Sequence, residues 1–267
     1  VRVNGGTPVL APTAEADGFK LTPQGLRQAL TPRTKWLILN SPGNPSGAVY
    51  SEAELAALAA VLREHPSVLV LWDEMYEQIW FDEPPAHLLR AAPDLAGRTL
   101  AVNGVSKAYA MTGWRLGYAC GPRPLIDAMT KVQMQINSHT SSVSQAAAVA
   151  ALNGPQDEVR RRCAIFQRRR DFLLGAFGRI DGLRTPTPEG AFYLFPDARA
   201  YLGRQTPAGV ALDDDVALAA YLLDNGVAVV PGSGFGMPGF LRLSYATSDD
   251  NLRIAAERMT HALNNLG

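Results

Sequence analysis

Cysteine and histidine are scarce in this chain of 267 residues, and neither sign of charge predominates. The 2 cysteines, Cys120 and Cys163, give no disulfide framework, and the 4 scattered histidines supply no set of metal ligands. The 25 basic side chains equal the 25 acidic ones, so nothing indicates a nucleic-acid coat or a polybasic membrane patch. We therefore expect a small-molecule partner, no metal, no nucleic acid, no membrane and a reducing, cytoplasmic location.

Long hydrophobic runs are also absent, although apolar residues make up 47% of the chain. No run approaches the roughly 20 residues of a membrane-spanning helix, and the chain does not open with a signal peptide. It does not begin with methionine, and we expect that Val1 is not the native start. The length suffices for one large core with a smaller lobe, and thus for an enzyme.

The first half of the chain alternates short β-rich runs with helical stretches, which predicts an α/β fold with a mostly parallel sheet. Helices are expected at 23–30, with Thr22 as the N-cap, and at 52–63, where Ser51 and Glu54 form a capping box. The expected strands cover 7–10, 36–40, 68–72, 99–102 and 116–119.

The second half predicts a smaller α/β lobe that follows a long basic helix. The arginines of this helix are interpreted as a solvated face, because no aromatic residues are interleaved to stack on nucleic acid. We expect a large domain over 1–155, a connecting helix over 156–180 and a small C-terminal domain over 181–267. Within the small domain the expected strands are 191–195, 227–230 and 241–245, and the expected helices are 214–225 and 249–266.

One lysine lies outside any charged run. Lys107 follows the apolar run 99–102 within the segment 103–118, and it has no charged neighbour until Arg115. We expect Lys107 to be at least partly buried, and burial favours the neutral amine that forms a Schiff base with an aldehyde. The alternative is a lysine at the edge of the core that pairs with a carboxylate.

Polar side chains follow the ends of three expected strands, namely Asn44, Asp73 and Lys107. In open α/β sheets, ligands bind at the carboxyl ends of the strands. The Asp73 carboxylate requires a cation or strong donors there, such as a protonated ring nitrogen of a cofactor, and Tyr76 can face the same site. The simpler alternatives are a helix cap or an ion pair for Asp73, and a plain tight turn for the segment around Asn44.

Two arginines have settings that suit anions. Arg115 lies among the small and apolar residues of 112–117, where its guanidinium can bind a phosphate bidentately. Arg242 is flanked by leucines in an apolar strand, and we expect it to bind a carboxylate from a ligand or from a structural partner. The glycine-rich loop at 231–236 lacks the strand-then-helix setting of a dinucleotide-binding fingerprint.

These motifs together resemble those of the aminotransferases of fold type I that use pyridoxal 5'-phosphate (PLP), specifically the class I branch of bacterial aspartate and aromatic aminotransferases. The resemblance covers nearly the whole chain. It implies that an amino group moves between an L-amino acid and a 2-oxo acid, and that the active protein is a homodimer. The matching segments, in order, are 40–47, 73–76, 106–118, 189–193 and 239–248.

The resemblance implies that Lys107 holds PLP through a Schiff base and then moves the substrate proton. Asp73 would keep the pyridine nitrogen protonated, so that the ring can accept electrons from the broken Cα–H bond. Lys107 and Asp73 would thus be the two residues that take part in the proton and electron transfer.

The remaining roles implied by the resemblance concern binding. Asn44 and Tyr76 would hydrogen-bond the phenolic oxygen of the cofactor, and Ser106 with Arg115 would hold its phosphate. Arg242 would bind the α-carboxylate of the substrate. The sequence does not decide whether the amino donor is aspartate or an aromatic amino acid. A prephenate-type amino acceptor is also compatible with it.

The chain departs from the resemblance in two places. The family has an N-terminal segment, with a glycine-rich turn for the phosphate and an aromatic residue that stacks on the ring, and no counterpart precedes Val1. The stretch 133–142 also differs, and we expect a helix end that packs on a neighbouring subunit. Its Met134, Ile136 and His139 would otherwise alter what fits near the partner's site.

Two further functions stay open for this sequence. A PLP-dependent carbon–sulfur lyase is the enzymatic alternative, and pyruvate release without an added 2-oxo acid would identify it. The alternative from another class is the aminotransferase-like sensor domain of a transcription regulator. A basic helix-turn-helix upstream of Val1 would identify that second alternative.

Overall fold

The computed structural model describes residues 1–267, and they form two compact units. The first unit contains Val1–Gly43 and Ala48–Arg161, and the second contains Asn44–Gly47 and Arg162–Gly267. The division falls inside helix α6 (Asp157–Phe177). Backbone hydrogen bonds attach the short Asn44–Gly47 segment to the second unit, because the amides of 189 and 190 both donate to the carbonyl of residue 47, at 3.0 and 2.9 Å.

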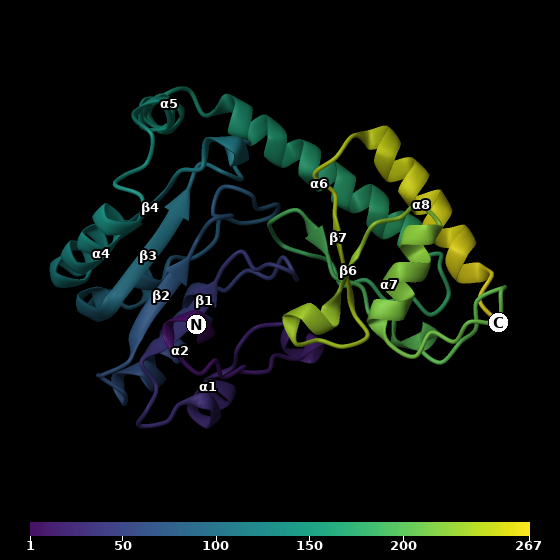
Figure 1. Ribbon diagram of the computed structural model, residues 1–267, viewed down its shortest axis with the longest axis horizontal. Coiled ribbons are helices and arrows are strands. Elements are labelled where there is room, and N and C mark those ends of the chain that lie inside the picture. Colours follow the sequence, from purple (N-terminus) through teal and green to yellow (C-terminus); the bar gives the residue numbers. More distant parts are fainter. The chain divides into compact units, whose positions relative to one another are not determined.

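A four-stranded sheet in the order β1-β2-β3-β4 forms the centre of the first unit (Figure 1). Strands β1 (Trp36–Asn40), β2 (Leu69–Asp73) and β3 (Thr99–Gly104) are parallel, and β4 (Gly117–Cys120) pairs antiparallel with β3. This mostly parallel sheet confirms the predicted α/β class. The carboxyl ends of β1, β2 and β3 therefore lie at one edge of the sheet.

The helices of the first unit begin where the sequence predicts caps. The Thr22 side chain accepts a hydrogen bond from the Gly25 amide, and Ser51 and Glu54 make both hydrogen bonds of a capping box. Both predicted helices are confirmed. Helix α4 ends within 133–142, where a helix end was expected, whereas α5 was not expected. The helices are α1 (Pro23–Ala29), α2 (Glu52–Arg63), α3 (Leu88–Ala91), α4 (Arg123–Ile136) and α5 (Ser142–Asn153).

The strand predicted at 7–10 is wrong, because these residues have no regular structure and pair with no strand. Val9 and Leu10 are both exposed, so the apolar pattern there has no layer against which to pack. A short β-rich run becomes a strand only where a neighbouring strand completes its backbone hydrogen bonds.

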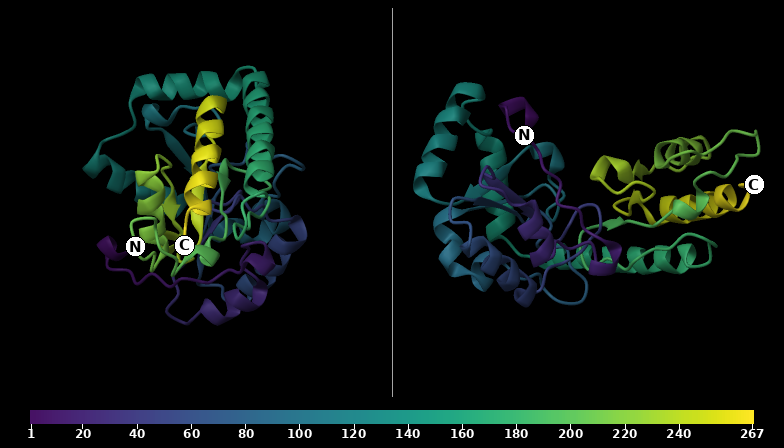
Figure 2. Two further views of the ribbon diagram at one scale, coloured as in Figure 1. Left: turned by 90° about the vertical axis from the view of Figure 1, so that its right-hand side faces the viewer. Right: turned by 90° about the horizontal axis from the view of Figure 1, so that it is seen from below.

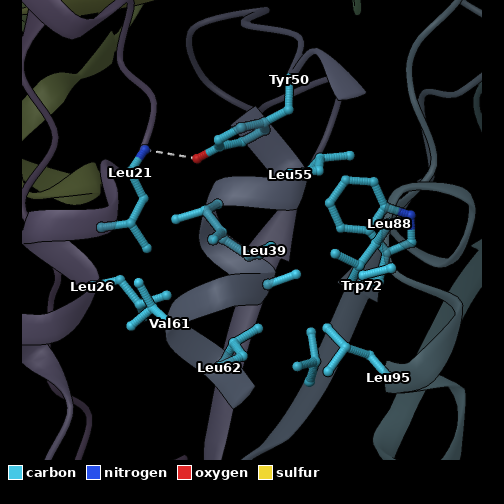
Figure 3. Close-up of a cluster of buried hydrophobic side chains, with 14 of the residues drawn as sticks. Leu21, Leu26, Leu39, Tyr50, Leu55, Val61, Leu62, Trp72, Leu88 and Leu95 are labelled. Carbon is cyan, nitrogen blue, oxygen red and sulfur yellow. Dashed lines mark hydrogen bonds between the residues drawn. The ribbon is translucent and has the colours of Figure 1, made fainter. Parts of the chain in front are cut away.

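The core of the first unit lies between the sheet and α2 (Figure 3). Alternate strand residues, such as Leu39 and Trp72, join Leu55 of α2 in one buried cluster. The Tyr50 hydroxyl accepts a hydrogen bond from the Leu21 amide at 2.7 Å, which joins the segment before α1 to this cluster. The strand alternation turns Ile38 the other way, and its side chain is 57% exposed.

The second unit contains a three-stranded antiparallel sheet in the order β5-β7-β6. Its strands β5 (Tyr193–Leu194), β6 (Val230–Pro231) and β7 (Leu241–Ser244) are shorter than expected. The expected strand at 191–195 begins late because Ala191 has a positive φ of 58°, which is incompatible with extended backbone.

Helices α7 (Asp215–Asp224) and α8 (Asp249–Asn264) complete the second unit. The second-unit part of α6 runs alongside α8 (Figure 2), and an ion pair of 2.5 Å between Arg169 and Asp249 joins them. No helix of the chain combines the length and the apolar character that crossing a membrane requires. The 3-10 helices are Arg2–Asn4, Glu15–Asp17, Pro93–Arg98, Thr112–Trp114, Arg199–Tyr201 and Gly232–Phe235.

Candidate active site

Lys107 lies in the turn that directly follows β3. The turn is closed by a hydrogen bond from the Ala110 amide to the Lys107 carbonyl at 3.1 Å, and another joins the Met111 amide to the Val105 carbonyl at 3.3 Å. The side chain is partly buried, as the sequence predicts, and its Nζ lies 5.9 Å from the centroid of the Tyr76 ring. The turn and the aromatic ring together limit the positions that the Lys107 amine can occupy.

Asp73 is the last residue of β2, the strand next to β3. Its Oδ1 accepts a hydrogen bond from the Met75 amide at 3.1 Å, and no cationic side chain of the protein pairs with it. Burial raises the pKa of Asp73 above its ordinary value and the charge of Glu74 adds to this effect, whereas the Met75 amide lowers it. Within the described residues the carboxylate thus has a backbone donor and no ion-pair partner, and it suits a cationic N–H donor supplied by a ligand.

Glu74 and His87 form a polar cluster beside Asp73 that the sequence did not reveal. Glu74 Oε2 accepts a hydrogen bond from Trp72 Nε1 at 3.0 Å and lies 3.1 Å from His87 Nε2. The hydrogen bond with Glu74 raises the pKa of His87 above its usual value, against the opposing effect of burial. Because His87 Nδ1 accepts the Leu89 amide at the start of α3, the Glu74 carboxylate is anchored to that helix.

Ser106 and Arg115 are linked through Thr112. The Thr112 hydroxyl donates to the Ser106 carbonyl at 3.0 Å, and Arg115 Nη1 donates to the Thr112 carbonyl at 3.0 Å. Arg115 has a left-handed backbone conformation, with a φ of 52°, and its side chain is exposed and pairs with no carboxylate. Its remaining N–H groups can therefore bind an anion.

In the second unit, Arg242 contacts Asn44. Arg242 Nη1 donates to Asn44 Oδ1 at 3.0 Å, and Arg242 Nε is buried without a hydrogen-bond partner. No carboxylate of the described residues forms an ion pair with this guanidinium, so its setting suits a carboxylate supplied by a ligand. The guanidinium carbon also lies 4.8 Å from the centroid of the Tyr193 ring and 5.1 Å from that of Phe235.

The seven candidate residues thus fall into two groups, one in each unit. In the first unit they follow the ends of the neighbouring strands β2 and β3, which brings an amine, a carboxylate and a guanidinium to one sheet edge. In the second unit, an amide contacts the guanidinium of the central strand β7. The first group is Asp73, Tyr76, Ser106, Lys107 and Arg115, and the second is Asn44 and Arg242.

Comparison with known proteins identifies the family of this chain. The family model "Aminotransferase class I and II" matches residues 1–259, and the chain belongs to this family. Aspartate aminotransferase of Rhizobium meliloti (strain 1021) is 52% identical over 271 residues, which cover 100% of this chain and 65% of the relative. Aspartate/prephenate aminotransferase of Cereibacter sphaeroides is 48% identical, with 97% of this chain and 65% of the relative covered.

Solved structures of aminotransferases have the same fold as this chain. The crystal structure of the aspartate aminotransferase from Rhizobium meliloti has a TM-score of 0.95 and 52% identity, covering 98% of this chain and 66% of that one. An aromatic aminotransferase from Pyrococcus horikoshii has a TM-score of 0.87 and 36% identity, covering 97% of this chain and 68% of that one. The chain spans about 65% of the length of the curated relatives that it matches.

Proposed function

We propose that this chain carries the catalytic lysine and the carboxylate-binding arginine of a PLP-dependent aminotransferase that acts on aspartate. The observation that carries the proposal is the position of Asp73 at the end of β2 and of Lys107 just after the end of the neighbouring strand β3. The Asp73 carboxylate forms no ion pair there. The names of the relatives support aspartate as the donor, and prephenate is the second candidate acceptor after 2-oxoglutarate.

The residues of the first unit fit the cofactor. PLP, when bound, supplies the electron sink that weakens the Cα–H bond of the substrate. The Asp73 carboxylate would hold a proton on the pyridine nitrogen, and Ser106 and Arg115 would bind the phosphate. Lys107 would hold the cofactor through its amine and would accept the proton from the substrate Cα.

The residues of the second unit orient the other ligand groups. Asn44 Oδ1 accepts a hydrogen bond from Arg242 Nη1. By the family resemblance, the Asn44 amide would donate to the phenolic oxygen of the cofactor. The resemblance also gives Tyr76, in the first unit, the role of a hydrogen-bond partner for the phenolic oxygen. Arg242 would bind the α-carboxylate of the substrate with its other N–H groups.

The assembly and location follow from the same proposal. We infer a homodimer in the cytoplasm, where both thiols, Cys120 and Cys163, would remain reduced. An amino acid and a 2-oxo acid are the two substrates, which exchange the amino group by ping-pong kinetics.

The test is an amino-transfer assay with the PLP-loaded holoenzyme. Aspartate alone should convert the cofactor from its aldehyde to its amine form, as seen in its absorbance, and 2-oxoglutarate should reverse the change. We expect Lys107→Ala to abolish turnover, and Lys131→Ala, at an exposed position of α4, to leave it unchanged. Turnover by the Lys107 variant would contradict the proposal, and pyruvate release from cystathionine without a 2-oxo acid would replace it with a lyase.

A further inference from the structure

Arg242 is held in an unusual setting for a cation. Its Nε is buried without an acceptor, and only Nη1 has a partner within the protein, the Asn44 side chain. Removing a charged donor from water without an acceptor costs free energy. The two aromatic rings, at 4.8 Å for Tyr193 and 5.1 Å for Phe235, offset this cost, because the negative face of an aromatic ring attracts a guanidinium.

The strand register explains why Tyr193 reaches Arg242. In the antiparallel pair of β5 and β7, Tyr193 lies opposite Ser244, so Tyr193 and Arg242 are diagonal neighbours on one face of the sheet. Tyr193 is buried and its ring centroid lies 4.8 Å from that of Phe192. The ring is therefore fixed before any ligand arrives.

Phe235 is also held in place by its surroundings. It ends the 3-10 helix Gly232–Phe235, and its ring centroid lies 6.2 Å from that of Phe195 in an edge-to-face arrangement. A side chain at Gly232 would approach the Met237 carbonyl to 2.3 Å, so this turn requires glycine. The buried Asp215 anchors the same loop by accepting the Ser233 amide at 2.6 Å.

We propose that Tyr193 and Phe235 are positioning residues that fix the plane of the Arg242 guanidinium, so that its remaining N–H groups meet the carboxylate of an amino acid or 2-oxo acid. The inference rests on Arg242 being the carboxylate-binding residue of the proposed function. Both aromatic residues act through Arg242 and contact no reacting atom. Their removal therefore weakens carboxylate binding and leaves the chemical step unaffected.

Calorimetric titration of 2-oxoglutarate into the PLP-loaded holoenzyme tests this proposal without turnover. We expect Phe235→Leu to weaken binding by about 2-fold to 30-fold, the range of a partly desolvated cation–π contact. Phe235→Tyr, which keeps the ring, should retain the wild-type affinity, and so should the matched control Phe172→Leu at a 46% exposed position of α6. In the amino-transfer assay, Phe235→Leu should raise KM and leave kcat and the cofactor absorbance unchanged.

A double-mutant cycle separates positioning from a general structural effect. In an Arg242→Lys background, Phe235→Leu should cause little further loss, because the planar group that it orients is gone. Wild-type affinity in Phe235→Leu, or an equal loss in both backgrounds, would overturn the positioning role. If the holoenzyme bound 2-oxoglutarate but transferred no amino group, the proposed function would be contradicted and the positioning role would not. If it did not bind 2-oxoglutarate, both the role of Arg242 and the positioning role would be contradicted.

Discussion

At the scale of single residues, three charged side chains of the candidate site have no ion-pair partner among the described residues. Asp73 pairs with no cation, and neither Arg115 nor Arg242 pairs with a carboxylate. Elsewhere in the chain, comparable groups are paired, as Asp197 is with Arg199. Uncompensated charges lower stability, and proteins retain them where a ligand supplies the partner.

The raised pKa of Asp73 leads to a prediction about pH and stability. A carboxyl group whose pKa is raised by folding binds a proton more strongly in the folded state. The free energy of unfolding of the cofactor-free protein should therefore fall as the pH rises from the ordinary pKa of 3.8 through the raised folded value. Asp73→Asn removes the carboxyl group that causes this fall in the free energy of unfolding. We therefore expect the variant to be more stable than wild type at neutral pH without PLP.

Denaturant unfolding over a range of pH measures this difference. The two proteins should converge in stability below the ordinary pKa of 3.8, where Asp73 is protonated in both states. Added PLP should stabilise wild type more than Asp73→Asn, because the neutral amide does not hold the pyridine proton. A variant that is less stable than wild type at neutral pH in the absence of PLP would contradict this explanation of the pKa.

At the scale of elements, helices were predicted best where their starts are encoded by neighbouring residues. Helix α2 spans Glu52–Arg63, which are the bounds expected from the capping box of Ser51 and Glu54. Helix α4 lacks such a signal, since its N-cap is Pro122 with no side-chain hydrogen bond, and none of its residues is buried. Without a cap or a buried face, a helix leaves little trace in the sequence.

The capping box gives a prediction at this scale. Ser51→Ala removes the acceptor of the Glu54 amide, and we expect it to lower the free energy of unfolding by about 1 kcal/mol. Ser141→Ala is the matched control, because Ser141 is the N-cap of α5 but makes no side-chain cap hydrogen bond. Its effect should stay within about 0.5 kcal/mol. Equal effects of the two substitutions in chemical denaturation would show that the capping box does not stabilise α2.

At the scale of the whole molecule, each unit has its own buried core. Leu55 lies in the cluster between α2 and the sheet of the first unit, and Leu222 lies in α7 of the second unit. Both side chains are fully buried. Because their cores are separate, the two units can unfold in separate transitions.

Calorimetric unfolding of two core variants tests this division. Leu55→Ala should lower the stability of the first unit and Leu222→Ala that of the second, each by about 2–5 kcal/mol. Ile38→Ala, at an exposed position of β1, should change stability by no more than about 0.5 kcal/mol. If both core variants shifted a single transition equally, the units would unfold as one body.

The sequence by itself determined the features that depend on neighbouring residues. The α/β class, the caps at Thr22 and Ser51, and the partial burial of Lys107 were all predictable, because periodicity, capping and local polarity act over a few residues. The same reasoning placed Asp73 and Lys107 at strand ends, where ligands bind in such folds.

Only the tertiary structure decided which distant residues meet. The run at 7–10 is not a strand because no partner lies beside it, and Asn44 joins Arg242 across 198 positions of sequence. Tyr193 and Phe235 reach the same guanidinium through strand register and a tight turn, which no local pattern specifies. Contacts of this kind depend on long-range pairing and packing, whose free energy is gained only when the whole unit has folded.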